Sequence, residues 1–324
     1  MSRMSVWMVL GVLVCAAVST SARGEPRKAP YRAVCTVAMV GDIVSHVAGE
    51  RAEVRSLIGS GVDPHLYKAT RDDVAALLKA DIVFYNGLML EGKMEEALHR
   101  AEKAGRRVVA VSEKAPADYL MLATQEGKQF DPHVWMDPTG WMHATRAVIE
   151  GLVAFDPERE EEYRARGEAY LKELEALREY AARTVATIPE GRRVLVTSHD
   201  AFGYFGRAFG LEVMGVQGIS TVSEAGLGDV ERLIGVIVDR DVPSVFVETT
   251  VSERTIRALV EGCAAKGRTV TIGGSLFSDA MGAPGTYEGT YVGMIDHNVT
   301  TIVRALGGEA PARGMQGKLS DDAR

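Results

Sequence analysis

The tripeptide Asp-Pro-His occurs at residues 63–65 and 131–133, and each copy is followed by an apolar and then an aromatic residue. Proline fixes its own φ and so lowers the entropy lost when the next side chain is held in place. Because proline has no N–H, the nearest forward amide for Asp63 or Asp131 is that of the histidine, an Asx-turn arrangement. The carboxylates could instead orient the imidazoles toward a metal ion. The repeat indicates either two ordinary turns or two loops that present histidines to a metal.

Three of the seven histidines stand at predicted strand ends or in loops. His65 and His199 each follow a predicted strand, His133 precedes a predicted helix, and Asp279 follows another strand. In open α/β sheets, ligands bind outside the carboxyl ends of the strands. Three imidazoles and one carboxylate suit Zn²⁺ in tetrahedral geometry and also accept Mn²⁺ or Fe²⁺. The other four histidines fall in predicted helices and are interpreted as surface or structural residues: His46, His99, His143 and His297.

A zinc-dependent hydrolase is the alternative function for these residues. Asp279 would then act as a base, water would be the fourth ligand, and Glu224 or Glu248 would be further acid/base candidates beside their plainer structural roles. Catalytic zinc normally keeps one coordination position open, whereas four protein ligands fill the tetrahedron. The sequence Ser-His-Asp at 198–200 cannot form a hydrolytic triad, because consecutive residues do not reach that geometry. We therefore expect a binding protein and not an enzyme.

Two blocks of alternating strand and helix patterns predict an α/β fold of two lobes, each with a mostly parallel sheet flanked by helices. The predicted N-terminal lobe spans residues 25–155 and the C-terminal lobe residues 189–308. The first expected strand begins the segment 31–49, which is predicted as a strand followed by a helix. The other expected strands cover residues 52–59, 81–88, 106–113, 192–198, 211–216, 244–250 and 268–274. The candidate ligands come two from each lobe, which predicts a metal site in the cleft between them.

Residues 156–188 predict one long helix that joins the lobes as a rigid strut. Asp156 is a favourable N-cap residue, and Pro157 suits the first helical position. Apolar residues at steps of three and four give this helix a continuous apolar face. The polar segment 309–324 is expected to be a disordered tail.

Residues 1–24 have the layout of a secretory signal: one early cation, an apolar run and then small residues. We expect this segment to be cleaved near Ala22 or retained as a membrane anchor. Without it the chain has 35 basic and 44 acidic residues, a net charge of −9. An acidic chain without basic clusters argues against nucleic-acid binding and is compatible with binding cations.

The three cysteines do not form a disulfide framework. Cys15 lies inside the signal, where Val14 occupies a position that is usually small in lipid-attachment signals. Cys35 and Cys263 lie far apart in the sequence and are expected to be buried as small apolar residues.

From about Tyr31 to Gly307 the chain resembles the cluster A-I, or cluster 9, metal-binding solute receptors of ABC importers. The segments that carry the resemblance are GVDPHLYKAT, DIVFYNGLMLEGKM, FDPHVWMD, VLVTSHDAFGYF, VQGISTVSEA and LFSDAMG with GTYVGMIDHN. The resemblance implies that His65, His133, His199 and Asp279 bind one metal ion between two lobes. It also implies an extracytoplasmic location, action as a monomer, and delivery of the ion to a membrane permease driven by a separate ATPase.

Two features leave the metal open between Zn²⁺ and Mn²⁺. Many zinc-specific relatives carry a long His-rich loop before the second ligand, but residues 113–129 contain no histidine. Many manganese-specific relatives have glutamate as third ligand, where this chain has His199.

Overall fold

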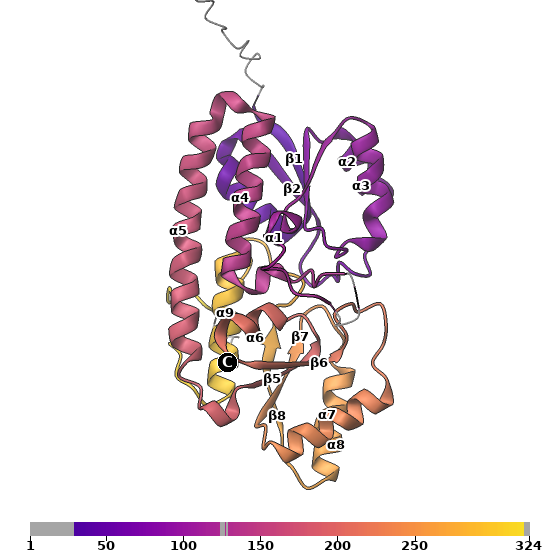
Figure 1. Ribbon diagram of the computed structural model, residues 1–324, viewed down its shortest axis with the longest axis vertical. Helices are drawn as coiled ribbons and strands as arrows, with labels where there is room; N and C mark the ends of the chain where they lie inside the picture. The colour runs from indigo at the N-terminus through magenta and orange to yellow at the C-terminus, as the bar shows by residue number, and fades with distance from the viewer. Residues whose placement is uncertain (1–28, 124–126, 128, 321–324) are drawn as a thin grey trace, which may run out of the picture.

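The computed structural model of the chain describes residues 29–123, 127 and 129–320. It has two α/β lobes stacked along its longest axis, with long helices running along one side of both (Figure 1). The predicted fold class is confirmed. The expected signal at residues 1–24, including Cys15, lies outside the described residues.

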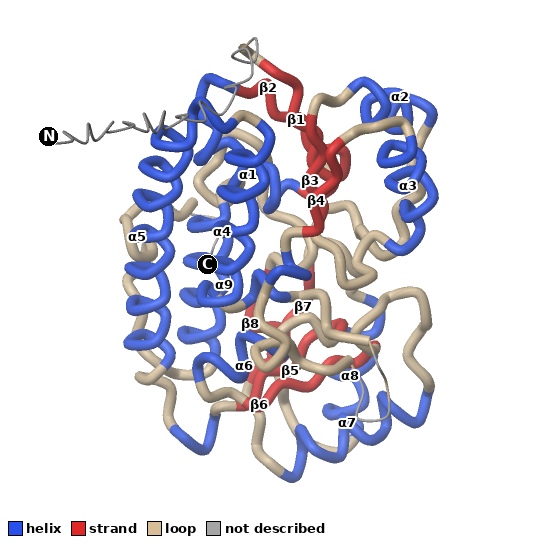
Figure 2. Tube along the Cα trace, turned by 45° about the horizontal axis from the view of Figure 1, so that its top comes forward, coloured by secondary structure: helices blue, strands red, loops and turns tan. Residues whose placement is uncertain are grey.

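The N-terminal lobe contains a parallel four-stranded sheet. Its strands follow the order β2-β1-β3-β4 and comprise β1 (Tyr31–Val37), β2 (Ala52–Ile58), β3 (Ile82–Tyr85) and β4 (Arg107–Ala110). Its helices are α1 (Ala38–Ala48), α2 (Arg71–Lys79), α3 (Glu95–Lys103) and α4 (Pro138–Phe155). Helices α1 and α4 lie on one side of the sheet and α2 and α3 on the other (Figure 2). Central strand β1 is almost wholly buried, as expected for a strand covered on both faces.

The C-terminal lobe contains two parallel strand pairs that lie next to each other through β5 and β7. The strands are β5 (Val194–His199), β6 (Glu212–Gln217), β7 (Ser244–Glu248) and β8 (Thr271–Leu276). The helices are α6 (Gly203–Phe209), α7 (Leu227–Asp239), α8 (Arg254–Ala265) and α9 (Tyr291–Ala305). Short 3₁₀ turns occupy Gly49–Arg51, Gly92–Met94, Ser112–Lys114, Val134–Met136, Pro157–Arg159 and Glu190–Arg192.

Helix α5 (Glu160–Val185) connects the lobes and packs against α1, α4 and α9. It begins after the 3₁₀ turn, and Asp156 does not cap it. The Asp156 carboxylate is buried and accepts hydrogen bonds from Arg51 at 2.7 Å and the Tyr163 hydroxyl at 2.9 Å. The Asp156 side chain therefore bonds Arg51 and Tyr163 instead of capping the helix, as the local sequence had predicted.

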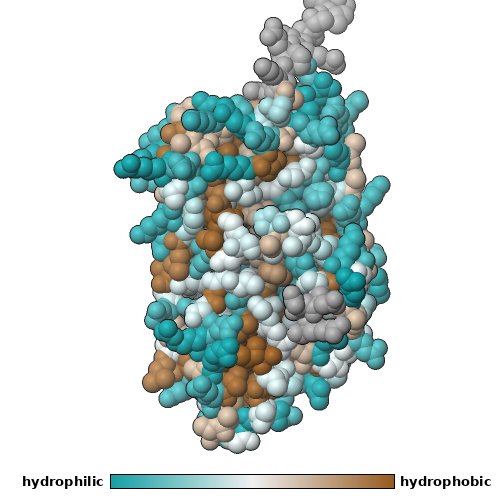
Figure 3. All heavy atoms as spheres, turned by 180° about the vertical axis from the view of Figure 1, so that it is seen from behind, coloured by the Kyte–Doolittle hydropathy of each residue, from teal (hydrophilic) through white to brown (hydrophobic). Residues whose placement is uncertain are grey.

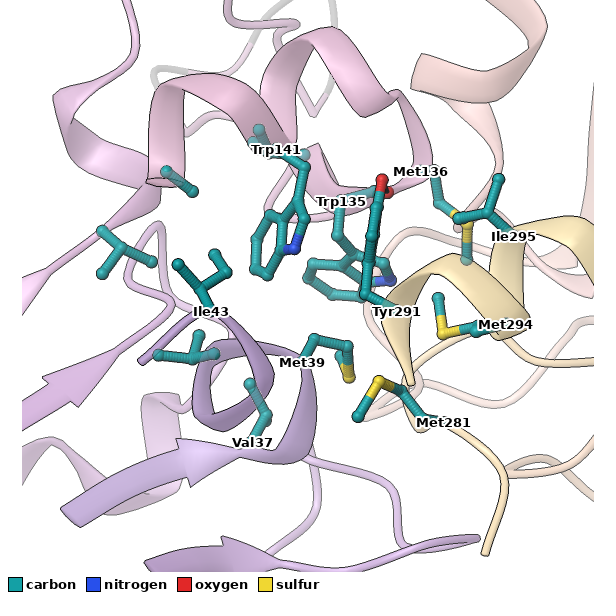
Figure 4. Packing of buried hydrophobic residues seen from close by; sticks show 14 of the residues in the cluster. Val37, Met39, Ile43, Trp135, Met136, Trp141, Met281, Tyr291, Met294 and Ile295 are labelled. Atoms are coloured by element: carbon teal, nitrogen blue, oxygen red, sulfur yellow. Dashed lines mark hydrogen bonds between the residues drawn. The ribbon is translucent and has the colours of Figure 1, made fainter. Parts of the chain in front are cut away.

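One apolar core runs through both lobes, and a second, smaller apolar cluster lies within the C-terminal lobe. At the interface, Tyr291 of α9 stacks on Trp141 of α4, with ring centroids 5.4 Å apart. Met39 of the N-terminal lobe and Met281 and Met294 of the C-terminal lobe belong to the same cluster (Figure 4). Because such interiors are close-packed, the shared core holds the two lobes rigidly against each other.

The prediction of a disordered tail is wrong for residues 309–320. The amide of Met315 donates to the buried Asp296 carboxylate at 2.8 and 2.9 Å, and the amide of Ser320 donates to Glu288. Leu319 is fully buried. The segment looked disordered because its composition is polar, but buried carboxylates of the lobe supply acceptors for its backbone. Residues 321–324 lie outside the described part of the chain.

The surface is mainly hydrophilic, with hydrophobic residues in separate groups on the face seen in Figure 3. Of the helices that the structure describes, none is both long enough and apolar enough to cross a bilayer. Cys35 and Cys263 are buried and free, as predicted.

Substitution Leu319→Ala should lower the free energy of unfolding by about 2–5 kcal/mol, because it empties a fully buried site. Urea unfolding followed by circular dichroism measures this. Leu227, which is 76% exposed, provides the control, and Leu227→Ala should change stability by no more than about 0.5 kcal/mol. Equal stabilities for the two variants would contradict the packing of the tail.

Candidate metal centre

Four buried side chains converge where the lobes meet: His65, His133, His199 and Asp279. One potential ligand atom from each lies within 4.8 Å of those from the other three. The structure therefore brings together all four residues singled out in the sequence. Their role as ligands remains a prediction.

Each residue reaches the centre from the carboxyl end of a strand or from the loop before a helix. His199 is the last residue of β5, and Asp279 lies three residues beyond the end of β8. His65 lies in the first histidine loop, residues 59–67, directly after β2. His133 lies in the second histidine loop, residues 130–137, directly before α4.

The distances match the edges of a coordination tetrahedron. The Nε2 atoms of His65 and His133 are 3.3 Å apart. The Asp279 carboxylate lies 3.3 Å from Nε2 of His133, 3.3 Å from Nε2 of His199 and 3.7 Å from Nε2 of His65. Metal–ligand bonds of about 2.0–2.1 Å in a tetrahedron place ligand atoms about 3.3 Å apart. These contacts involve both oxygens of Asp279, and their lengths are compatible with a tetrahedral ion such as zinc.

The polar atoms at this centre lack other partners. Within the part of the chain that the structure describes, Nε2 of His199 and both carboxylate oxygens of Asp279 are buried without a hydrogen bond. Buried polar atoms are nearly always hydrogen-bonded, so each exception needs an explanation. A cation held among these atoms supplies one, because it satisfies all of them at once.

Asp131 both forms the turn and orients the imidazole. One of its oxygens accepts hydrogen bonds from the backbone amide of His133 at 2.9 Å and from Nδ1 of the same histidine at 2.7 Å. A proton on Nδ1 leaves Nε2 free to bind a metal. The sequence left turn former and imidazole partner open for Asp131, and the structure shows both.

Glu248 plays the corresponding part for His199. The carboxylate at the end of β7 accepts hydrogen bonds from the His199 amide at 2.8 Å and from Nδ1 at 2.5 Å, and it is buried. Sequence reasoning named Glu248 only as a spare acid/base or structural residue. Its position at a strand end was the available signal, but its pairing with His199 depends on the contact between β5 and β7. Glu224, the other spare carboxylate, is exposed.

Asp63 forms the Asx turn and also accepts a hydrogen bond from a residue of the other lobe. One oxygen accepts a hydrogen bond from the His65 amide at 2.8 Å. The other accepts one from the Thr221 hydroxyl at 2.5 Å. Thr221 lies in the segment VQGISTVSEA, which helps to carry the family resemblance, but the sequence did not indicate its bond to Asp63.

The carboxylates determine the charges of the imidazoles. Burial alone would lower the pKa of His133, but Asp131 and Asp279 outweigh it and raise this pKa to about 9. Burial acts likewise on His199, where Glu248 and Asp279 raise the pKa well above its usual value. Burial lowers the pKa of His65 to about 4, despite Asp279. The carboxyl of Asp279 resists the effect of burial because His199 and His133 hold its pKa well below the usual range.

The remaining histidines lie away from the centre, as predicted. Nδ1 of His46 bonds the carbonyl of Asp42, and Nε2 of His297 bonds the carbonyl of Ser275. His99 is exposed, and His143 is partly exposed beside the Tyr119 ring.

A two-lobed α/β chain with a buried, nitrogen-rich centre between its lobes has the features of a solute-binding protein. Residues 33–305 match the family described as "Zinc-uptake complex component A periplasmic". The chain therefore belongs to this family, the cluster A-I metal-binding solute-binding proteins, as its sequence motifs predicted.

Individual relatives agree over most of their length. The zinc-binding protein TroA of Treponema pallidum is 46% identical over 273 residues, which cover 84% of this chain and 88% of TroA. The manganese-binding lipoprotein MntA of Bacillus subtilis is 43% identical over 287 residues, 89% of this chain and 93% of MntA. The solved structure of the periplasmic zinc-binding TroA superposes with a TM-score of 0.82 and covers 85% of this chain and 99% of that one.

Metal binding near neutral pH should release at least one proton. His133 has a raised pKa in the metal-free protein, so its imidazole is protonated at neutral pH and must lose a proton to bind a metal. Affinity should therefore rise with pH up to about 9 and fall as the solution is acidified. Calorimetric titration with Zn²⁺ in buffers of different ionisation enthalpy measures the release. A binding heat that is independent of the buffer would contradict this assignment.

Substitution Glu248→Gln should weaken Zn²⁺ binding by about 10–100-fold, because it removes the negative charge beside Nδ1 of His199. Competition with a chelator of known affinity measures the change. The control is Glu224→Gln, which alters an exposed carboxylate and should leave the affinity unchanged. Similar affinities for all three proteins would show that Glu248 does not support the histidine.

Proposed function

We propose that this chain is the extracytoplasmic receptor of an ABC importer and captures one divalent transition metal ion with His65, His133, His199 and Asp279. The observation that carries the proposal is the buried four-residue centre, whose inward-facing atoms have the spacing of a tetrahedral site. Membership of a family of metal-binding solute receptors supports the same conclusion.

The ion is Zn²⁺ or Mn²⁺, and Fe²⁺ fits the same ligands. Three imidazoles favour zinc over manganese by the Irving–Williams order, so loading with manganese depends on which metal is available. The names of the relatives point both ways, since TroA is called zinc-binding and MntA manganese-binding. The ion is cargo, and its binding and release are the activity of the protein.

The hydrolase alternative finds no support. Glu248, one of its acid/base candidates, already accepts two hydrogen bonds from His199, and Glu224 lies at the surface. Both oxygens of Asp279 lie close to the imidazoles, which suits a fourth ligand better than a base acting on a bound water. The proposal is therefore a receptor without catalytic activity.

The partners follow from this function. The receptor delivers its ion to a permease in the cytoplasmic membrane that a separate ATPase drives. Relatives are described as periplasmic or as lipoproteins, which supports export of this chain by residues 1–24, with that segment removed or kept as an anchor. The chain acts as a monomer and binds no nucleic acid.

Protein purified without chelator, from cells grown with zinc, manganese and iron, should contain one transition metal ion per chain. Elemental analysis measures the content and identifies the metal. His65→Ala and His199→Ala should abolish tight binding, because each removes one of four ligands. The control His99→Ala alters an exposed histidine and should retain the metal. Metal-dependent turnover of ester, peptide or phosphate substrates would contradict the receptor function.

A further inference from the structure

The second histidine loop is fastened firmly to the C-terminal lobe. The Tyr204 hydroxyl of α6 donates to the carbonyl of Asp131 at 3.0 Å. The indole of Trp135 donates to the carbonyl of Ser278, next to Asp279, at 2.9 Å. The Tyr291 hydroxyl of α9 donates to the carbonyl of Trp135 at 2.8 Å. All three bonds are buried, and Trp135 belongs to the core that joins the lobes. His133 therefore cannot move away from Asp279 without disrupting the interior.

The first histidine loop has a much weaker connection. Among residues 29–123, 127 and 129–320, one hydrogen bond joins this loop to the C-terminal lobe, from the Thr221 hydroxyl to Asp63. Thr221 lies in the segment between β6 and α7 and is 7% exposed. The same carboxylate forms the Asx turn with the His65 amide through its other oxygen. One side chain thus fixes both the conformation of the loop and its distance from the other lobe.

This hydrogen bond lies beside a cavity between the lobes. Asp63 and Thr221 line a cavity of about 350 Å³ together with Leu66 and Thr250, from both lobes. Leu66 is 45% exposed, so the loop faces solvent on its outer side. Gly61 has φ of +71°, a left-handed conformation that favours glycine and marks a bend at the start of the loop. The loop therefore has a bend at one end, solvent on one side and, among the described residues, one hydrogen bond to the C-terminal lobe.

We propose that Thr221 is a positioning residue for His65: its hydrogen bond to Asp63 latches the first histidine loop to the C-terminal lobe and sets the rate at which the metal leaves. When the bond breaks, the loop moves outward and carries His65 away, while His133, His199 and Asp279 stay in place. The ion is then held by three ligands and is open to solvent. This inference rests on the proposed metal-receptor function and adds the ligand that departs first.

Substitution Thr221→Val tests the latch, because valine keeps the shape of threonine and removes only the donor. The metal-loaded protein is mixed with excess chelator in a stopped-flow instrument, with Co²⁺ as the probe because its visible spectrum reports coordination geometry. Dissociation should become about tenfold faster, which is the effect of losing one hydrogen bond to a charged group. The spectrum before mixing should match that of the unmodified protein, since all four ligands remain.

Two further variants separate the latch from general damage. Thr250→Val alters another threonine that lines the same cavity, but its hydroxyl bonds Ser278 within the C-terminal lobe at 3.0 Å. It should leave the dissociation rate within about twofold of the original value, because no bond between the lobes is lost. Thr221→Ser restores the hydroxyl and should restore slow dissociation. If the valine variant does not fold, Thr221→Ala removes the same donor without adding volume.

The outcomes separate the latch from the receptor function. Unchanged dissociation in the variant that lacks the Thr221 hydroxyl would overturn the latch, as would equal acceleration by Thr250→Val. Failure of the unmodified protein to bind Co²⁺ or Zn²⁺ would overturn the receptor function itself. Faster dissociation that is specific to Thr221, with an unchanged spectrum and rescue by serine, would establish the latch.

Discussion

The attraction between the buried carboxylate of Asp279 and the positive charge beside it is the interaction on which the rest of the site depends. Asp279 is 1% exposed, and neither of its oxygens has a hydrogen-bond partner in the described structure. An isolated buried carboxylate costs several kcal/mol, so it requires a cation or protonated neighbours. In the metal-free protein, raised pKa values at His133 and His199 place that charge on the imidazoles. In the proposed function a divalent ion would replace those protons and satisfy the same carboxylate, so that capture would exchange one stabilising charge for another.

This exchange requires imidazoles that stay in position whether or not the ion is bound. Asp131 and Glu248 hold the outer nitrogens of His133 and His199, and the core that joins the lobes holds the loops that carry them. Helix α5 packs against helices of both lobes and resists a change in the angle between them. Because the ligands are ordered beforehand, little entropy is lost on binding. The first histidine loop is the exception, because in the described structure one hydrogen bond joins it to the C-terminal lobe.

The sequence was informative where local chemistry decided the outcome. Alternating strand and helix patterns identified both lobes, and positions at strand ends, or for His133 before a helix, identified the four converging side chains. The Asp-Pro-His repeat indicated stiffened loops, and both proved to contain the Asx bond to the histidine amide.

Sequence reasoning was insufficient where contacts between residues distant in the sequence determine the role of a side chain or the order of a segment. Asp156 reads as a helix cap but pairs with Arg51, more than a hundred residues away in sequence. The tail reads as disordered because its buried partners, Asp296 and Glu288, lie on other elements. Thr221 lies in the quoted segment VQGISTVSEA, but its hydrogen bond to Asp63 forms only where the two lobes meet. These are all effects of tertiary packing on residues whose local signal is weak or points elsewhere.

The central claim is that four protein side chains enclose one metal ion between the lobes. Crystals of the protein as purified, measured with X-rays at the absorption edge of the metal found in it, test this most directly. We predict a single anomalous peak about 2.0–2.2 Å from Nε2 of His65, His133 and His199, with Asp279 completing the ligand set. A peak elsewhere in the molecule, or an ion with water in place of Asp279, would contradict the account.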